Sequence, residues 1–330
     1  MPRTRSSGQG PFVFIHRDDL SNLPSDARTF EVDLHGGFAE DSREEHGEIY
    51  YGMPNCGILR VDEDLGRQEI ISLPGDLEPL NFHSTTFGQF DGEYRLILPA
   101  NNNEKVVILD LDGGVEFVLP RPVFEEYQDR EAPYNPTDTV LVDDQLYIAD
   151  GYGSNYISSY DLPKREWSSI FGGKTEDPDQ HGRFGTAHGI NRHPVHGHLD
   201  IADRPHSRIQ SHHPDGRFLR SHKLPAGAFL CGINYTEYQE WLYGVIGCLH
   251  DPDEDRPAPV YIIDAESYEL VSTIRPKEEL GVELAQHIHN VIFHRYQDRL
   301  FLICQSWNPG CYFVLEQVPS GTTPNPDAAI

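Results

Sequence analysis

The sequence predicts an all-β protein: a six-bladed β-propeller of four-stranded blades, with the ring closed by the N-terminal strand. Short runs of Val, Ile, Leu, Tyr and Phe, bounded by Gly, Pro, Asn and Asp, occur along the whole chain, as is typical of β-strands. The 29 glycines and 25 prolines among 330 residues indicate many turns. A unit of about fifty residues recurs six times, which is the period expected of propeller blades.

The six units share one pattern, in which a short strand, a turn, a strong strand and a polar loop precede a third strand that ends near Asp. A fourth short strand, such as REWSSIFG, follows most of them. One position near the start of each unit sets the register and recurs every 43 to 58 residues. The residues at that position are His35, His83, Asp138, His188, Cys231 and His289.

The last unit has no fourth strand of its own, and the segment PFVFIHRDD near the chain start has the composition of one. We therefore expect this segment to complete the last blade and close the ring, because closure removes an exposed sheet edge. No linker divides the chain, so residues 11–318 are predicted to form a single propeller. Residues 1–10 are predicted to be a disordered N-terminal extension, and residues 319–330 a flexible tail.

Charge and composition narrow the classes of partner. The net charge of −27 would repel a phosphate backbone, which argues against nucleic acid. No run approaches the roughly 18 apolar residues of a membrane span, and the apolar run Pro11–Ile15 is too short for a signal peptide. The five cysteines are odd in number and include no CxxC pair, which favours reduced thiols and a cytoplasmic location. The sequence does not indicate an oligomeric state.

The register places side chains on the propeller axis, because the first strand of each blade lines the central channel. The second, fourth and sixth blades contribute His83, His188 and His289. Alternate blades of a six-fold ring lie about 120° apart, so three imidazoles can converge on one axial point. Three neutral histidines with an open fourth position are typical of a catalytic zinc site, and another divalent transition metal is also compatible.

Three further residues share this register. His35 breaks the alternation, and it is predicted either to contact the metal shell or the substrate, or to fill the channel. Asp138 either orients a ligand or binds the channel backbone, and the sequence favours the backbone role. Cys231 is interpreted as a small packed residue.

The stretches PTDTVLVDDQLYIADGYGSNYI and FGTAHGIN…LDIADRPHSRIQ resemble NHL-repeat propellers. In particular, they are similar to the peptidyl-α-hydroxyglycine α-amidating lyase family, from about Ile58 to Arg208 and again at 288–293. The resemblance implies zinc on the same three histidines that the register selects, and a structural calcium whose ligands the sequence does not indicate. It also implies a catalytic base at Tyr152 and a nearby arginine at Arg204. The family has Asp where this chain has Asn290.

These observations predict a metal-dependent lyase that acts on a small hydroxy- or carbonyl-bearing substrate at the channel. Arg204 is expected to bind a substrate carboxylate, and Tyr152, with its pKa lowered by a nearby cation, to act as general base. Asn290 and Trp307 are predicted to lie near the substrate, with His35 and Asp138. Because the chain has no recognisable secretion signal, we expect a substrate different from that of the amidating lyase.

Two alternatives remain open at this stage. One is a metal-dependent hydrolase similar to lactonase propellers, which hold calcium mainly with Glu, Asp and Asn. The other is a non-catalytic NHL scaffold that binds proteins, and such a scaffold has no need of three histidines in the channel.

Overall fold

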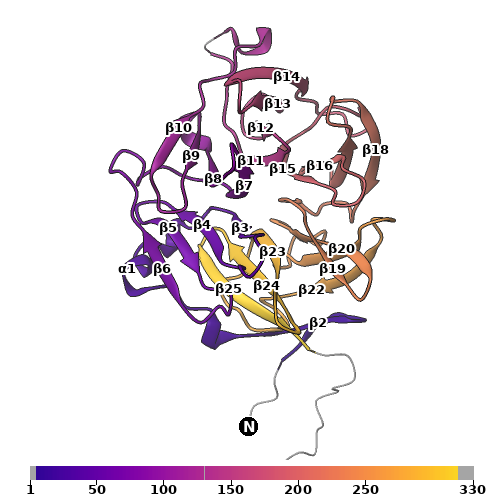
Figure 1. The fold of residues 1–330 in the computed structure, drawn as a ribbon. Helices are drawn as coiled ribbons and strands as arrows, with labels where there is room; N and C mark the ends of the chain where they lie inside the picture. The colour runs from indigo at the N-terminus through magenta and orange to yellow at the C-terminus, as the bar shows by residue number, and fades with distance from the viewer. Residues whose placement is uncertain (1–4, 130, 319–330) are drawn as a thin grey trace, which may run out of the picture.

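A computed structural model describes residues 5–129 and 131–318 of the chain. Six antiparallel sheets are arranged as a ring around a central axis, as Figure 1 shows. The first strand of each blade is innermost, so the predicted six-bladed, all-β propeller is confirmed. The first three blades contain β3 (Phe38–Glu40), β4 (Ile49–Met53), β5 (Gly57–Val61) and β6 (Gln68–Ile71); β7 (Thr86–Phe90), β8 (Glu93–Ala100), β9 (Lys105–Leu109) and β10 (Val115–Val118); and β11 (Asp138–Val142), β12 (Gln145–Ala149), β13 (Tyr156–Asp161) and β14 (Glu166–Gly172).

The remaining blades follow the same order. They contain β15 (Ala187–Arg192), β16 (Leu199–Asp203), β17 (Arg208–His212) and β18 (Phe218–Lys223); β19 (Asn234–Tyr238), β20 (Trp241–Gly247), β21 (Val260–Asp264) and β22 (Leu270–Ile274); and β23 (Ile288–Tyr296), β24 (Arg299–Ser306) and β25 (Cys311–Gln317), joined by β2 (Phe12–His16) and β1 (Ser7–Gln9). The helices are single turns: α1 (Ser25–Arg28), η1 (Asp18–Leu20), η2 (Glu31–Asp33), η3 (Asn101–Asn103) and η4 (Glu125–Tyr127). No helix among the described residues is long and apolar enough to cross a membrane.

The N-terminal strand closes the ring as predicted. Strand β2 pairs antiparallel with β25, which makes it the fourth strand of the last blade. Its side chains Phe12 and Phe14 are fully buried in the core. The structure differs from the prediction at residues 7–9, because this part of the expected disordered extension forms β1, a fifth strand paired with β2. Residues 1–4 and the predicted tail 319–330 lie outside the described residues.

Burial changes with the position of a strand in its blade. The second strand β4 and the third strand β17 are buried along their whole lengths, because neighbouring blades pack on both of their faces. The outer strands β6 and β18 contain no fully buried residue. The core therefore lies between the blades, and the inner strands are left to line the axis.

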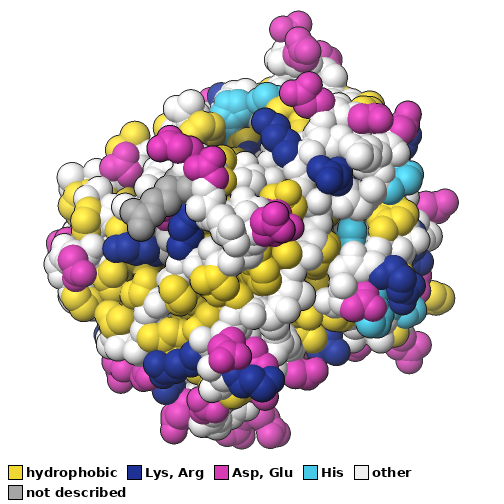
Figure 2. All heavy atoms as spheres, turned by 90° about the horizontal axis from the view of Figure 1, so that it is seen from above, with side chains coloured by type: hydrophobic (Ala, Val, Ile, Leu, Met, Phe, Trp, Pro, Cys, Tyr) yellow, Lys and Arg dark blue, Asp and Glu magenta, His cyan; other side chains and the backbone are white. Residues whose placement is uncertain are grey.

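The excess of Asp and Glu over Lys and Arg lies on the surface. Figure 2 shows Asp and Glu side chains distributed over the visible face instead of being gathered in one patch. A dispersed negative surface favours solubility and does not by itself indicate a partner.

Candidate metal and substrate site

Two of the channel histidines lie at irregularities in strand pairing. The register between β15 and β16 shifts between Ala187 and Gly189, and His188 is the residue between them. The register between β23 and β24 shifts in the same way on either side of His289. A β-bulge re-aims a side chain that regular pairing would hold in the pleat. The bulges at His188 and His289 therefore explain how two inner strands, otherwise regularly paired, direct these imidazoles into the channel.

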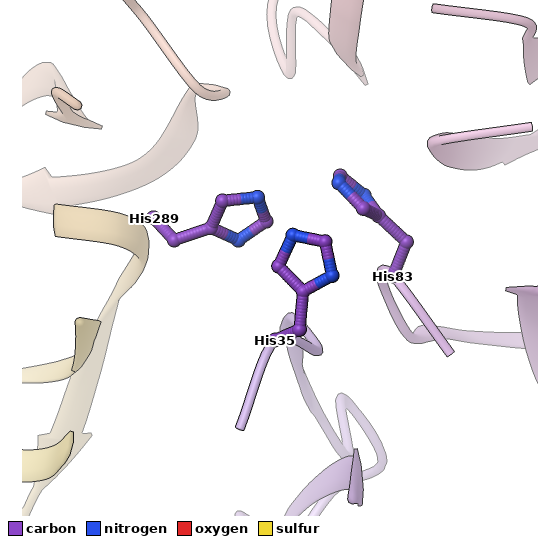
Figure 3. Close-up of side chains that lie close together, drawn as sticks. All are labelled: His35, His83 and His289. Atoms are coloured by element: carbon purple, nitrogen blue, oxygen red, sulfur yellow. The ribbon is translucent and has the colours of Figure 1, made fainter. Parts of the chain in front are cut away.

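His35, His83, His188 and His289 form one cluster, hereafter the histidine cluster. The ring centroids of neighbouring members lie 4.4 to 5.0 Å apart. One nitrogen each from His35, His83 and His289 lie within 4.8 Å of one another, and Figure 3 shows these three rings pointing toward a common centre. The structure thus brings the three predicted ligands together and adds His35, which the sequence left between two roles.

Two members of the cluster are oriented by backbone carbonyls that lie just before the inner strand of the next blade. Nδ1 of His83 donates to the Thr137 carbonyl at 2.7 Å, and Nδ1 of His188 donates to the Cys231 carbonyl. Because a carbonyl only accepts, the proton lies on Nδ1, and Nε2 of each ring is left with a lone pair. This is the usual support of a metal-binding histidine.

Several ring nitrogens have no hydrogen-bond partner. Nε2 of His83 and both nitrogens of His289 are buried and unpaired in the structure. A buried polar atom without a partner costs on the order of 1–3 kcal/mol, and a bound metal ion would satisfy such atoms. Nε2 of His188 differs, because it lies 3.1 Å from the Tyr152 hydroxyl. His35 lies within hydrogen-bonding distance of the Asn81 amide.

The histidine cluster is electrically neutral. Burial lowers the pKa values of His83, His188 and His289 well below the ordinary value, and the nearby Arg204 charge acts in the same direction. Burial likewise lowers the pKa of His35 to about 4. Neutral imidazoles are the form that binds metal ions, so the site is ready for a metal at neutral pH without first losing protons.

Arg204 is a buried cation beside this neutral cluster, with only 6% of its surface exposed. Its guanidinium donates to the Tyr152 hydroxyl at 2.9 Å, to the Cys231 sulfur at 3.3 Å and weakly to the Leu230 carbonyl. Burial raises the pKa of the Cys231 thiol, so that sulfur is neutral as well. Arg204 therefore forms no salt bridge with any described residue, which is costly for a buried charge and indicates a site for an anionic group.

The prediction that a cation lowers the pKa of Tyr152 is wrong for the protein alone. Burial of the hydroxyl end raises this pKa and outweighs the opposing effect of Arg204. The hydroxyl accepts from Arg204 and donates to Nε2 of His188. Tyr152 is therefore a neutral phenol in this state, placed between a cation and an imidazole.

Small residues permit close approach of the backbones at the cluster. A Cβ atom on Gly189 would lie 2.4 Å from the Cys231 carbonyl oxygen, the atom that orients His188. A Cβ atom on Gly151 would lie 2.3 Å from the Ala187 carbonyl oxygen. Neither position has room for a side chain, so the spacing between blades at the cluster depends on glycine.

The other predicted residues take different positions. Asp138 accepts backbone N–H bonds from Thr139 and Ile190, both at 2.9 Å, so it joins the third and fourth blades, and burial raises its pKa to about 6. Asn290 accepts from the Phe38 N–H at 3.3 Å. Both line a cavity of about 300 Å³ in the channel, together with His289. The Trp307 ring centroid lies 5.6 Å from that of His35, and 39% of Trp307 is exposed.

Sequence reasoning missed several supporting groups. The carbonyls of Thr137 and Cys231 orient two histidines, yet backbone atoms leave no composition signal. Asn81 contacts His35 from within the second unit, two residues before His83. The position of Asn81, two residues before the register residue His83, was the one sequence feature that could have indicated its role.

The fold and the histidine cluster define a class: a six-bladed β-propeller with a buried group of histidines able to bind a metal. No protein-family model matches the chain, and no curated protein matches it. Among solved structures, a gluconolactonase from Xanthomonas campestris is similar at 14% identity and a TM-score of 0.58, over 94% of this chain and 99% of that one. A chain of a nidogen/laminin complex is similar at 14% identity and a TM-score of 0.55, over 88% of this chain and 98% of that one. These likenesses establish the propeller fold.

Proposed function

We propose that the protein is a metal-dependent enzyme, a lyase that acts on a small 2-hydroxy acid or related carbonyl compound at the histidine cluster. The observation that carries this proposal is the buried Arg204, which has no salt bridge among the described residues and lies beside a neutral cluster with unpaired nitrogens. A cation in such a place suits a substrate carboxylate, bound by two parallel N–H donors.

His83 and His289 are the proposed ligands common to every arrangement of the site, and a third comes from His188 or His35. His188 matches the register of the other two, and its Nδ1 is oriented in the same way as that of His83. His35, with His83 and His289, forms the group whose ligand atoms all lie within 4.8 Å of one another. Ligation by His188 requires the Tyr152 hydroxyl to leave Nε2, whereas ligation by His35 leaves that hydrogen bond in place.

A zinc-type metal held by these histidines would supply Lewis-acid chemistry at a substrate oxygen. Arg204 holds the substrate carboxylate and fixes the reacting carbon near the cluster. Tyr152 exchanges a proton through its Oη atom, which Arg204 stabilises when the phenol is ionised. In a lyase reaction on an α-hydroxyglycine derivative, the hydroxyl loses its proton and its oxygen forms a C=O double bond, while the carbon–nitrogen bond breaks and the leaving amide nitrogen takes up a proton.

A metal-dependent hydrolase is the second candidate, since the same metal and Arg204 can polarise a lactone carbonyl and activate water. One propeller that resembles this chain over almost its full length is described as a gluconolactonase. A non-catalytic scaffold is the third candidate. It gives no role to Arg204, which forms no salt bridge with any described residue.

An activity screen separates these candidates. Purified protein is tested on N-acyl α-hydroxyglycines and on sugar lactones, before and after treatment with a chelator and again after metal is restored. We expect cleavage of a hydroxy acid that chelation abolishes and metal restores. Lactone hydrolysis alone would favour the hydrolase, and inactivity of the metal-loaded protein on both classes would favour the scaffold.

A further inference from the structure

The fifth blade has an unusual second-strand loop, GCLHDPDEDRPAP at residues 247–259, for which the proposed function gives no role. This loop forms one wall of a cavity of about 490 Å³ whose lining includes His287, two residues before the cluster residue His289. Its other wall contains Phe229, Gln286 and His287. The volume lies within the range of small-molecule pockets. We refer to this cavity as the blade-five pocket.

The blade-five pocket adjoins the proposed reaction site through short stretches of backbone. His287 precedes the cluster residue His289 by two positions, and its carbonyl accepts from the Trp307 N–H at 2.9 Å. Phe229 precedes Cys231, the thiol that contacts Arg204, by two positions. Arg204 is also close enough for its charge to lower the pKa of His250, an effect second to that of burial and of His287. A ligand held at Arg204 would therefore lie next to the segment Phe229–Cys231, whose first residue lines the pocket.

Aromatic rings form the floor of the pocket. The rings of Phe229 and His250 stack with centroids 4.4 Å apart and planes 28° apart, and the His287 ring centroid lies 5.9 Å from that of His250. His250 is exposed and Phe229 is half-buried, so the stack is open to solvent on one side. Stacked rings with a free face favour a flat apolar group through offset or edge contacts.

Most of the charged groups around the pocket are paired, and Glu254 is the lining carboxylate that forms no salt bridge with any described residue. Arg275 binds Asp251 at 2.8 Å, and Arg256 binds Glu278 at 2.9 Å. Nδ1 of His287 donates to the Leu249 carbonyl at 2.6 Å. Apart from Glu254, the ring-lined wall is therefore charge-balanced, whereas the cation without a salt bridge lies at Arg204.

We infer that the blade-five pocket binds the side group of the substrate and selects an aromatic ring there. This inference rests on the proposed function only in that Arg204 holds the carboxylate. The preferred substrates are then 2-hydroxy acids that carry an aryl group. Removing a phenyl ring from water is worth about 1.5–3 kcal/mol, so an aryl acid should bind roughly 10- to 100-fold more tightly than its methyl counterpart.

The test compares 2-hydroxy-2-phenylacetate with 2-hydroxypropanoate by titration calorimetry, on samples whose metal content is measured. We expect the phenyl acid to bind more tightly to the parent protein. His250→Ala and Phe229→Ala should each reduce that advantage about tenfold and leave binding of the methyl acid and the metal content unchanged, while His250→Phe should keep the advantage. Trp241→Ala is the matched control, since Trp241 is 63% exposed on the same blade.

Three results would overturn the assignment: equal binding of the two acids by the parent protein, no binding of either acid, or a phenyl advantage that survives both His250→Ala and Phe229→Ala. His250 is exposed, so His250→Ala is not expected to unfold the protein. The test therefore remains valid even if substitution of the half-buried Phe229 destabilises the fold. If the purified protein contains no metal and the phenyl advantage still disappears in the two variants, the blade-five pocket is upheld. Only the proposed metal chemistry is then refuted.

Discussion

Substitution of one glycine beside His188 should disturb the histidine cluster without touching an imidazole. In Gly189→Ala the new Cβ would lie 2.4 Å from the Cys231 carbonyl oxygen and 2.5 Å from the Gly232 Cα. Real Cβ atoms do not come so close to backbone, so the fourth and fifth blades must separate locally. Overpacking of this kind costs about 1–3 kcal/mol, and loss of the His188 hydrogen bond adds about 1 kcal/mol.

The matched control is Gly232→Ala, at the facing position. There the nearest atom to a new Cβ is the Gly189 Cα at 3.9 Å, an ordinary contact, and the expected change is within about 0.5 kcal/mol. Urea unfolding followed by fluorescence measures both variants. Gly189→Ala should lower the free energy of unfolding by about 2–4 kcal/mol, and equal midpoints for the two variants would refute the described packing of the blades at the cluster.

Four further predictions follow from other contacts. Phe14→Ala should cost about 3–5 kcal/mol in urea unfolding, because Phe14 is fully buried in the strand that closes the ring; a cost below 1 kcal/mol would contradict that closure. Arg204→Gln should weaken calorimetric binding of 2-hydroxypropanoate by about 10- to 100-fold with the metal retained, and unchanged affinity would exclude the carboxylate role. Tyr152→Phe should lower kcat more than it raises KM, and an unaltered kcat would remove Tyr152 from proton transfer. Burial lowers the pKa of His35 from 6.5 to about 4, so the unfolded chain binds a proton that the fold does not; metal-free protein should therefore lose about 3 kcal/mol through His35 as the pH falls from 6.5 to 4, whereas a His35→Gln variant with the same acid dependence would contradict this.

The fold could be predicted from the sequence because each blade is a local unit. Strand, turn and loop recur every 43 to 58 residues, and each unit can bury its faces only against its neighbours. The ring closure could be predicted because the last unit lacks a fourth strand and the segment PFVFIHRDD belongs to no other unit. Strand β1 was not predicted, because Ser7–Gln9 contains no apolar run and pairs through its backbone with β2.

The site could be predicted only in part, because the repeat pattern does not specify where individual side chains point. Register places His83, His188 and His289 at one level of the channel, but β-bulges decide where the rings of His188 and His289 point, and neither Ala187–Gly189 nor Ile288–Asn290 was predicted to bulge. His35 belongs to the first blade and breaks the alternation of the second, fourth and sixth blades, so an argument from alternate blades could not assign it. The pKa of Tyr152 was predicted in the wrong direction because its proximity to Arg204 was foreseen and the burial of its hydroxyl was not.

The central claim is that the histidine cluster binds a metal, and elemental analysis of purified protein tests it directly. We predict about one zinc-type ion per chain in the parent protein and none in His83→Ala or His289→Ala, with His250→Ala as a control that keeps the metal. Loss of the ion in only one of His188→Ala and His35→Ala identifies the third ligand. A parent protein without metal after growth in zinc-supplemented medium, or His289→Ala protein that keeps a full equivalent, would contradict the account.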